Sequence, residues 1–408
     1  MARRTLLLGL LLSCLVTTLF STRAEAVPSF ARQTGLSCAS CHTVFPELTP
    51  LGRSFKLNGY TMTGIKEKIT AKNTPAASGL DLSKIIPLSF MLQVSGTHTK
   101  GATPSTETYL PDQLSLFLAG EFTPHIGSFI QMTMEQGTGF SLDNTDIRYA
   151  NQSGALTYGA TLNNNPTVQD PWNSTPAWGY PWTHGADIPA PVVADGLGQN
   201  VAGLGGYGYW DNKIYAEFDL YNGTNAFDLN DATDVRVVNP APYWRLALTN
   251  TFGNGDNLMV GTYGMNTSVI DATTYSGPTD NYLDLAMDTQ YDHRFHDSNR
   301  MLSVHARYTN EQQTLDLSDP GASPTVNYVR VDGTYHWGYH ATATLAYAQD
   351  SGPDAEYDDV AWTAQASYLP WQNVKFTLQY TAYSKLAGLT GSDATDNNTL
   401  LLQGWFML

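Results

Sequence analysis

The amino-acid sequence predicts a mainly β fold, in which a short helical segment precedes a large antiparallel barrel. Three observations support this prediction. From Ile85 onward, apolar and polar residues alternate with a period of two. After the N-terminal leader, no apolar run approaches the roughly 18 residues that a membrane-spanning helix needs. The chain holds 23 tyrosines but is only 14% charged. Such a composition, with alternating segments, is typical of a barrel that spans an outer membrane.

The first 26 residues are predicted to form a signal peptide. A short basic stretch at the N-terminus is followed by an apolar run from Leu6 to Phe20 and by an Ala-x-Ala site that ends at Ala26. This arrangement is typical of a segment that is removed on export. We therefore expect the mature chain to begin at Val27, outside the cytoplasm. Cys14 would be lost with the leader.

The two remaining cysteines belong to the motif Cys38-Ala39-Ser40-Cys41-His42. In a Cys-x-x-Cys-His segment both thiols form thioethers with a c-type haem, and the adjacent imidazole becomes an axial ligand of the iron. A zinc site would need further Cys or His nearby, and a thioredoxin-like site would need a βαβ context. The surrounding sequence offers neither. It therefore predicts one covalent haem c held by Cys38, Cys41 and His42.

Residues 27–84 are predicted to form a small α-helical haem domain with a linker. One helix is expected between Ser29 as N-cap and Gly35, and a second from Thr49 to Asn58, with Pro at its first position. Residues 70–83 are polar and are expected to be a linker. A segment of this size cannot bury a comfortable core of its own, and a covalent haem would supply the missing apolar bulk.

Residues 85–408 are predicted to form an antiparallel barrel of 16 strands. In segment 213–221, Phe218 belongs to an aliphatic face and Glu217 to a charged one, as a strand between lipid and a polar lumen requires. An even strand number closes the sheet without an edge in lipid. The segments lie near residues 86–98, 112–121, 125–136, 143–150, 154–163, 201–209, 212–222, 243–252, 256–266, 282–291, 299–309, 327–336, 338–348, 359–369, 373–383 and 398–407.

The connections between these segments alternate between tight turns and long polar loops. Short periplasmic turns and long external loops are the pattern of outer-membrane barrels. Trp210, Trp337, Trp371 and Trp405 lie near the short turns, where an aromatic girdle is expected. The alternative, a large soluble β-sandwich or propeller, is disfavoured because the polar face is rich in Gln, Thr, Asp and Lys and no blade repeat is visible.

Two parts of the chain resemble a known family. The segments Val27–Gly35, Cys38–His42 and Phe45–Tyr60 resemble the fused monohaem cytochrome–porins, which include outer-membrane iron oxidases. The stretches Asn165–Trp172 and Thr175–Pro181 are also similar to that family. The resemblance implies that a small haem domain plugs or lines a 16-stranded barrel. It also implies that electrons pass from an extracellular donor, Fe(II) in the best-known members, to periplasmic carriers.

The expected function is that of an outer-membrane electron-transfer cytochrome–porin. One haem cannot serve both sides of an apolar band about 25 Å tall unless it lies within the pore. We expect oxidation of an extracellular donor, in the first place Fe(II), and transfer to a periplasmic c-type cytochrome or similar carrier. The alternatives are a haem-plugged diffusion porin and a conduit that exports electrons to an external acceptor. The expected location is the outer membrane of a Gram-negative bacterium, in contact with its lipid and with loops at the cell surface. The net charge of −16 argues against nucleic acid as a partner.

The sixth iron ligand is not fixed by the motif. Met62 is the first candidate, because a thioether ligand raises the reduction potential; a packing role for Met62 or a five-coordinate iron is the alternative. Met91 and His98 are weaker candidates. The haem propionates could pair with three basic residues, Arg32, Arg53 and Lys56.

The external loops offer two further candidates. The loop of residues 163–200 is unusually rich in aromatic residues: Trp172, Trp178, Tyr180, Trp182 and His184. It is expected either to fold into the lumen or to cap the barrel from outside. Acidic clusters could concentrate Fe(II), or could be solvated loop faces. They comprise Asp228, Asp231 and Asp234; Asp350, Asp354, Glu356, Asp358 and Asp359; and Asp393 and Asp396.

Overall fold

The computed structural model describes residues 28–62, 68–70, 81–83, 85–135, 137, 139–166, 168–172, 174, 188, 190–194, 197–223, 235–271, 274, 276–296 and 299–408. The predicted signal peptide lies outside these residues. Within them, no helix is long and apolar enough to cross a membrane.

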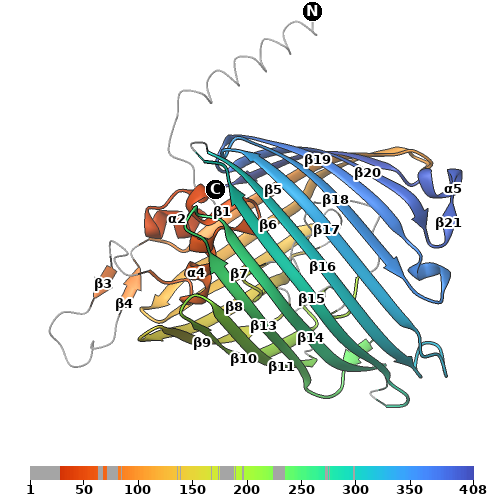
Figure 1. Ribbon diagram of the computed structural model, residues 1–408, viewed down its shortest axis with the longest axis horizontal. Helices are drawn as coiled ribbons and strands as arrows, with labels where there is room; N and C mark the ends of the chain where they lie inside the picture. The colour runs from red at the N-terminus through yellow and green to blue at the C-terminus, as the bar shows by residue number, and fades with distance from the viewer. Residues whose placement is uncertain are drawn as a thin grey trace, which may run out of the picture.

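The described chain forms a closed antiparallel barrel (Figure 1). Of its 18 strands, β12 (Val235–Val237) and β21 (Leu389–Thr390) are short additions, which leaves the 16 long strands that the alternation predicts. The long strands are β5 (Leu88–Thr99), β6 (Thr106–Thr123), β7 (Ile126–Glu135), β8 (Ser141–Ser153), β9 (Leu156–Asn163), β10 (Val201–Trp210), β11 (Ile214–Gly223), β13 (Ala241–Thr251), β14 (Asn257–Asp271), β15 (Asp280–Arg294), β16 (Arg300–Leu315), β17 (Thr325–Trp337), β18 (Ala341–Ser351), β19 (Val360–Trp371), β20 (Val374–Leu386) and β22 (Thr399–Met407). The last strand, β22, pairs with the first, β5, so the hydrogen-bond ladder has no edge between them.

Several strands extend beyond their predicted ends on the long-loop side. β14 continues to Asp271 and β16 to Leu315, about five residues past the segments expected from alternation. In the β16 extension residues 310–314 are all polar, so the alternation that marks the rest of the strand is absent there. The hydrogen-bonded strand therefore extends further along the sequence than the alternating pattern from which it was predicted.

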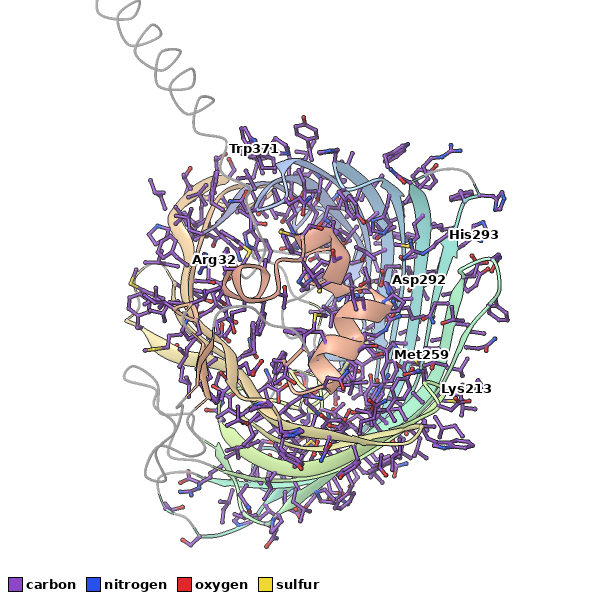
Figure 2. The ribbon with its side chains drawn as sticks, turned by 90° about the vertical axis from the view of Figure 1, so that its left-hand side faces the viewer. Arg32, Lys213, Met259, Asp292, His293 and Trp371 are labelled. Carbon is purple, nitrogen blue, oxygen red and sulfur yellow. The ribbon has the colours of Figure 1, made fainter. Side chains whose placement is uncertain are left out.

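The two faces of the wall differ as the pattern requires. Phe218 is 53% exposed on the outer surface, while its neighbour Glu217 is 4% exposed and faces the lumen. Large apolar side chains are exposed along the outside, and the buried polar residues point inward (Figure 2). An apolar belt around a closed sheet is stable in lipid, where no backbone group is left unpaired. The chain is therefore an outer-membrane β-barrel.

The aromatic girdle is confirmed for three tryptophans and wrong for the fourth. Trp210, Trp337 and Trp371 are about half exposed at the short-turn ends of their strands. Trp405 is only 2% exposed, and its ring lies beneath the ammonium group of Lys375 at 4.2 Å. The distance of a residue from the turn does not decide which side of the wall its side chain faces. Side chains alternate between the two sides along β22, and this alternation places Trp405 on the inner side.

The N-terminal helices lie at one end of the barrel, within the ring of strands (Figure 2). They are α2 (Pro28–Thr34), α3 (Cys38–Cys41) and α4 (Pro50–Leu57), with the small hairpin β1 (His42–Val44) and β2 (Glu47–Leu48) between the last two. We call residues 28–60 the plug. Part of the predicted linker pairs as a second small hairpin, β3 (Lys68–Thr70) with β4 (Asp81–Ser83).

Local signals explain the plug helices. The Thr49 hydroxyl accepts a hydrogen bond from the Gly52 N–H and Pro50 follows it, which confirms the predicted start of α4. Ser29 is different: it lies inside α2 and not at its cap. Its hydroxyl donates to the Ala119 carbonyl at 2.8 Å and its backbone N–H donates to the Ser89 hydroxyl. Ser29 therefore fastens the plug to the barrel wall instead of starting a helix.

The facing of β11 can be tested with one charge. We expect Phe218→Lys to destabilise the folded barrel by about 2–4 kcal/mol, because a lysine near mid-membrane loses its hydration in lipid. Phe218→Leu, which keeps an apolar side chain on the same face, serves as the control. Unfolding by urea in lipid vesicles measures the difference. Equal stability of the two variants would contradict the assignment of this face to lipid.

Candidate functional site: a cavity beside the Cys-x-x-Cys-His segment

The Cys-x-x-Cys-His segment folds as one helical turn followed by extended backbone. α3 spans Cys38–Cys41, and His42 leaves the helix with φ −121° while its N–H bonds back to the Cys38 carbonyl. The α4 segment packs directly on this turn: a Cβ atom on Gly52 would lie 2.2 Å from the Cys41 carbonyl oxygen. Only glycine permits this approach, so Gly52 sets the distance between α3 and α4.

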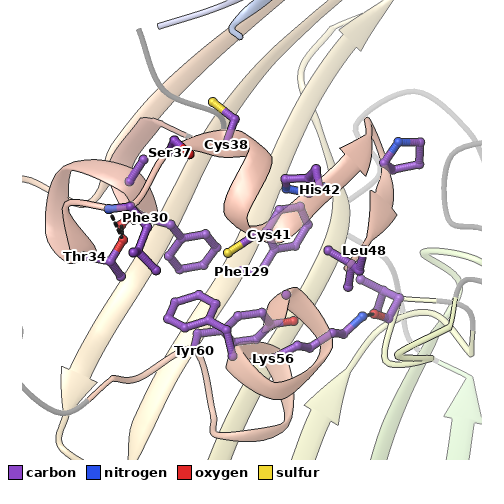
Figure 3. A pocket seen from close by; sticks show the side chains of 16 residues that line it. Phe30, Thr34, Ser37, Cys38, Cys41, His42, Leu48, Lys56, Tyr60 and Phe129 are labelled. Carbon is purple, nitrogen blue, oxygen red and sulfur yellow. Dashed lines mark hydrogen bonds between the residues drawn. The ribbon is translucent and has the colours of Figure 1, made fainter. Parts of the chain in front are cut away.

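A cavity of about 1010 Å³ of atom-free space, part of it open to solvent, lies beside this turn (Figure 3). Cys38, Cys41 and His42 are among the residues that line it. Four aromatic side chains also line it: Phe30, Phe55, Tyr60 and Phe129. The Phe30 ring stacks on that of Tyr60 at 5.5 Å and meets Phe55 edge-on at 5.1 Å. The cavity is therefore lined mainly by apolar and aromatic side chains.

The groups around the cavity fit a covalently attached haem. The two thiols form no disulfide with each other. The His42 side chain is half-buried, its buried Nδ1 atom has no hydrogen-bond partner, and desolvation lowers its pKa to about 4. Uncharged imidazole is the form that binds iron. A haem would occupy the apolar cavity, be attached through both thiols and be ligated by His42.

The remaining ligand candidates lie elsewhere. Met62 is half-buried and does not line the cavity, so its role as sixth ligand stays a prediction. Met91 is fully buried, in a cluster with Cys38, Phe45 and other residues. His98 bonds to Thr106 on the barrel wall.

Among the three predicted propionate partners, only Lys56 lines the cavity in the described part of the chain. Its ammonium group donates to the backbone carbonyls of Val168 and Asp170, and burial lowers its pKa to about 8. Arg32 donates to the Leu88 carbonyl. Arg53 donates to the Leu48 carbonyl and to the side chain of Asn257.

The hydrogen bonds from Lys56 to the carbonyls of Val168 and Asp170 show the path of the loop that follows β9. Its described first part enters the lumen: Val168 lines the cavity and Trp172, 3% exposed, packs edge-on against Tyr215 at 5.1 Å. Of the two alternatives that the sequence leaves open, the inward path therefore holds for this part. The other four residues of the predicted aromatic set lie outside the described residues: Trp178, Tyr180, Trp182 and His184.

Two buried arginines hold this inward loop. Arg245 of β13 lies 2.6 Å from the Asp288 carboxylate and 3.4 Å from that of Asp170 in the loop. Arg148 of β8 pairs with Asp146 at 2.7 Å and donates to the Gln169 carbonyl at 2.6 Å. Both side chains are fully buried.

Arg148 and Arg245 do not stand out in the sequence, because a luminal strand face is expected to be polar throughout. A single arginine between two large hydrophobic residues, as in Ile147-Arg148-Tyr149 and Trp244-Arg245-Leu246, was the signal that could have found them.

The acidic loop clusters serve the protein's own structure where they are described. Asp350 accepts a hydrogen bond from the Asp359 backbone N–H at 2.7 Å, and Asp358 pairs with Lys385 at 3.0 Å. Asp396 pairs with Lys100 at 2.9 Å. The cluster Asp228, Asp231 and Asp234 lies outside the described residues. Across the described ranges, no group of three or more His, Cys, Asp or Glu could hold a metal ion.

No family model matches this sequence, and no curated protein matches it. Among solved structures, the barrel is similar to OmpF of Salmonella typhi, determined in complex with daunomycin: the TM-score is 0.51 at 11% identity, over 79% of this chain and 97% of that one. A loop-deleted OmpT of Vibrio cholerae and an anion-selective porin of Comamonas acidovorans both have TM-scores of 0.49, with 9% and 12% identity. These two matches cover 79% and 78% of this chain and 98% of each porin. The likeness to OmpF establishes the porin-type barrel fold.

Removing Arg245 should release the inward loop. Arg245→Ala leaves the buried carboxylates of Asp170 and Asp288 without their cation, at a cost of about 3–5 kcal/mol. We therefore expect a larger single-channel conductance in planar bilayers and faster proteolysis within residues 164–200. Lys213→Ala is the matched control, since the exposed Lys213–Asp211 pair contributes only about 0–1 kcal/mol. An unchanged conductance in Arg245→Ala would show that this pair does not hold the loop.

Proposed function

We propose that this chain is an outer-membrane electron-transfer cytochrome–porin. It carries one haem c on Cys38, Cys41 and His42, oxidises an extracellular donor, in the first place Fe(II), and passes electrons to a periplasmic c-type cytochrome or similar carrier. One observation carries the proposal: the Cys-x-x-Cys-His turn borders an aromatic cavity in a plug that is packed into a membrane-spanning barrel. When bound there, the haem supplies a one-electron acceptor.

The plug is held firmly enough to keep a redox centre at a fixed place in the pore. Ser29 bonds to the wall at Ala119, and the Tyr60 hydroxyl donates to the buried carboxylate of Asp146 at 2.6 Å. The ammonium group of Lys375 on β20 donates to the Phe45 carbonyl at 3.2 Å. Fixed positions matter because electron transfer falls steeply with distance, and these bonds fix the plug on several sides.

The roles of the chain's own groups follow from their positions. Phe30, Phe55 and Tyr60 offer flat apolar surfaces on which a planar ring system could pack. His42 offers a neutral ring nitrogen, and Lys56 adds a cation to the cavity lining that could pair with an anionic substituent. The described part of the inward loop is bonded to Lys56 through the carbonyls of Val168 and Asp170.

A haem-plugged diffusion porin is the second candidate. The likeness of the barrel to OmpF favours it directly, since it concerns the barrel and not the plug. A conduit that exports electrons to an external acceptor is the third possibility, and it uses the same parts in the reverse direction. The reduction potential separates these functions, because a donor such as Fe(II) requires an acceptor of clearly positive potential.

Covalent attachment is tested by removing the thiols. We expect Cys38→Ala combined with Cys41→Ala to abolish covalently bound haem, measured by the pyridine haemochrome spectrum of the purified protein. Cys14→Ser is the matched control, because Cys14 lies in the predicted leader and should not affect the haem. A full c-type signal in the double variant would exclude attachment at this motif.

The donor is tested by anoxic reduction. We expect Fe(II) added to the oxidised full-length protein to produce the reduced haem spectrum within seconds, with dithionite as the reference for complete reduction. The double cysteine variant controls for signals that do not come from the protein's haem. If Fe(II) leaves the haem oxidised while dithionite reduces it, Fe(II) oxidation is excluded, and the porin or export function takes its place.

A further inference from the structure

The small hairpin of the plug places a carboxylate against the barrel wall. In this hairpin His42 is opposite Leu48 and Val44 is opposite Glu47. His42 thus faces the cavity from one strand, and Glu47 leaves the other strand toward the lumen wall. The Glu47 side chain is 9% exposed, and its Oε2 lies 3.4 Å from Nε2 of His305 on β16. A carboxylate and an imidazole therefore meet a few residues from the predicted axial ligand.

The geometry of this contact suits a metal ion between the two groups. Oxygen and nitrogen ligands lie about 2.1 Å from a divalent first-row metal, so two neighbouring ligands are about 3.0 Å apart at the octahedral angle and about 3.4 Å apart at the tetrahedral angle. The Nε2 atom of His305 has no hydrogen-bond partner. The other ring nitrogen, Nδ1, lies 2.9 Å from Oδ1 of Asp332 on β17. A carboxylate on the far side of a ligating histidine fixes the ring and its tautomer.

A second imidazole lies in the same part of the lumen. His336, on the same strand face as Asp332, is 3% exposed, and Asp292 and His305 are the charged or ionisable groups that act on its ring. Asp292 is itself held at 3.8 Å from the guanidinium group of Arg53.

We propose that Glu47 and His305 bind the substrate metal, a hydrated divalent first-row cation, with Asp332 as the positioning residue behind His305. The proposal rests on the proposed function and names the donor site within it. Imidazole and carboxylate are ligands that Fe(II) accepts, together with other divalent first-row cations. Two protein ligands leave the remaining coordination positions to water.

The redox balance at this site is simple. If His42 holds a haem, the oxidation of one bound Fe(II) to Fe(III) would release the one electron that an oxidised haem would take up, and hydrated Fe(III) would then leave. No bond to oxygen forms and no further reactant is needed. Without a metal, His305 links two carboxylates as an ion triad that ties the plug to the wall. The experiment must separate a metal site from this purely structural triad.

Binding is measured with Co(II), which resembles Fe(II) in its ligand preference but does not reduce the haem. Isothermal titration of the haem-loaded full-length protein in detergent should show one Co(II) bound per chain. Glu47→Gln and His305→Gln keep side-chain size and some hydrogen bonding, and each should weaken binding by at least tenfold. Asp332→Asn should weaken it by about 10–100-fold, through the orientation of His305.

His293→Ala is the matched control. His293 forms a similar pair with Asp256, at 2.9 Å, near a short turn and away from the plug, so the variant should bind Co(II) like the wild type. Absence of Co(II) binding in the wild type, or equal binding in His305→Gln, overturns the metal site and leaves the structural triad. Co(II) binding that depends on Glu47 and His305, together with a haem that Fe(II) fails to reduce, keeps the metal site and overturns Fe(II) oxidation instead.

Discussion

Closure of the sheet is the constraint on which the rest of the structure depends. Lipid offers no hydrogen bonds, so each backbone group in the wall must find a partner within the sheet. The pairing of β22 with β5 completes that requirement. Closure also creates an enclosed polar space whose side chains must be satisfied in turn. The plug and the inward loop fill much of this space and supply partners to the wall.

The lumen is organised by ion pairs that cross between separate elements. Arg245 joins β13 to the loop through Asp170 and to β15 through Asp288. Arg148 places its guanidinium over the Tyr207 ring, 5.1 Å from its centre. A fully buried charge is costly unless it is well paired, so these contacts also fix the loop in one position. The described first part of the loop is consequently held in the lumen by specific electrostatic contacts.

Local periodicity predicted which residues of the wall face outward or inward, but it did not predict the contacts inside the lumen. Phe218 and Glu217 could be assigned to opposite faces because a strand alternates regardless of what surrounds it. The Cys38–His42 motif and the Thr49 cap could be identified because each acts over a few residues. The inward path of the loop depends on Asp170 meeting Arg245, 75 positions away in the sequence. Contacts of that separation leave no local pattern. The outward position predicted for Trp405 was wrong for a different reason. It was inferred from the nearness of Trp405 to a turn, whereas the alternation of side chains along the strand decides which face a residue occupies.

The burial of the Cys38 side chain bears on the order in which the protein assembles. Its side chain is 5% exposed and packs in a cluster with Leu369, Trp405 and Met407, which come from β19 and β22. These partners are in place only once β22 has closed the barrel. If Cys38 carries the proposed haem, the thioether bond would therefore have to form before closure, while the thiol is still accessible. Under that proposal, attachment in the periplasm would precede insertion into the membrane.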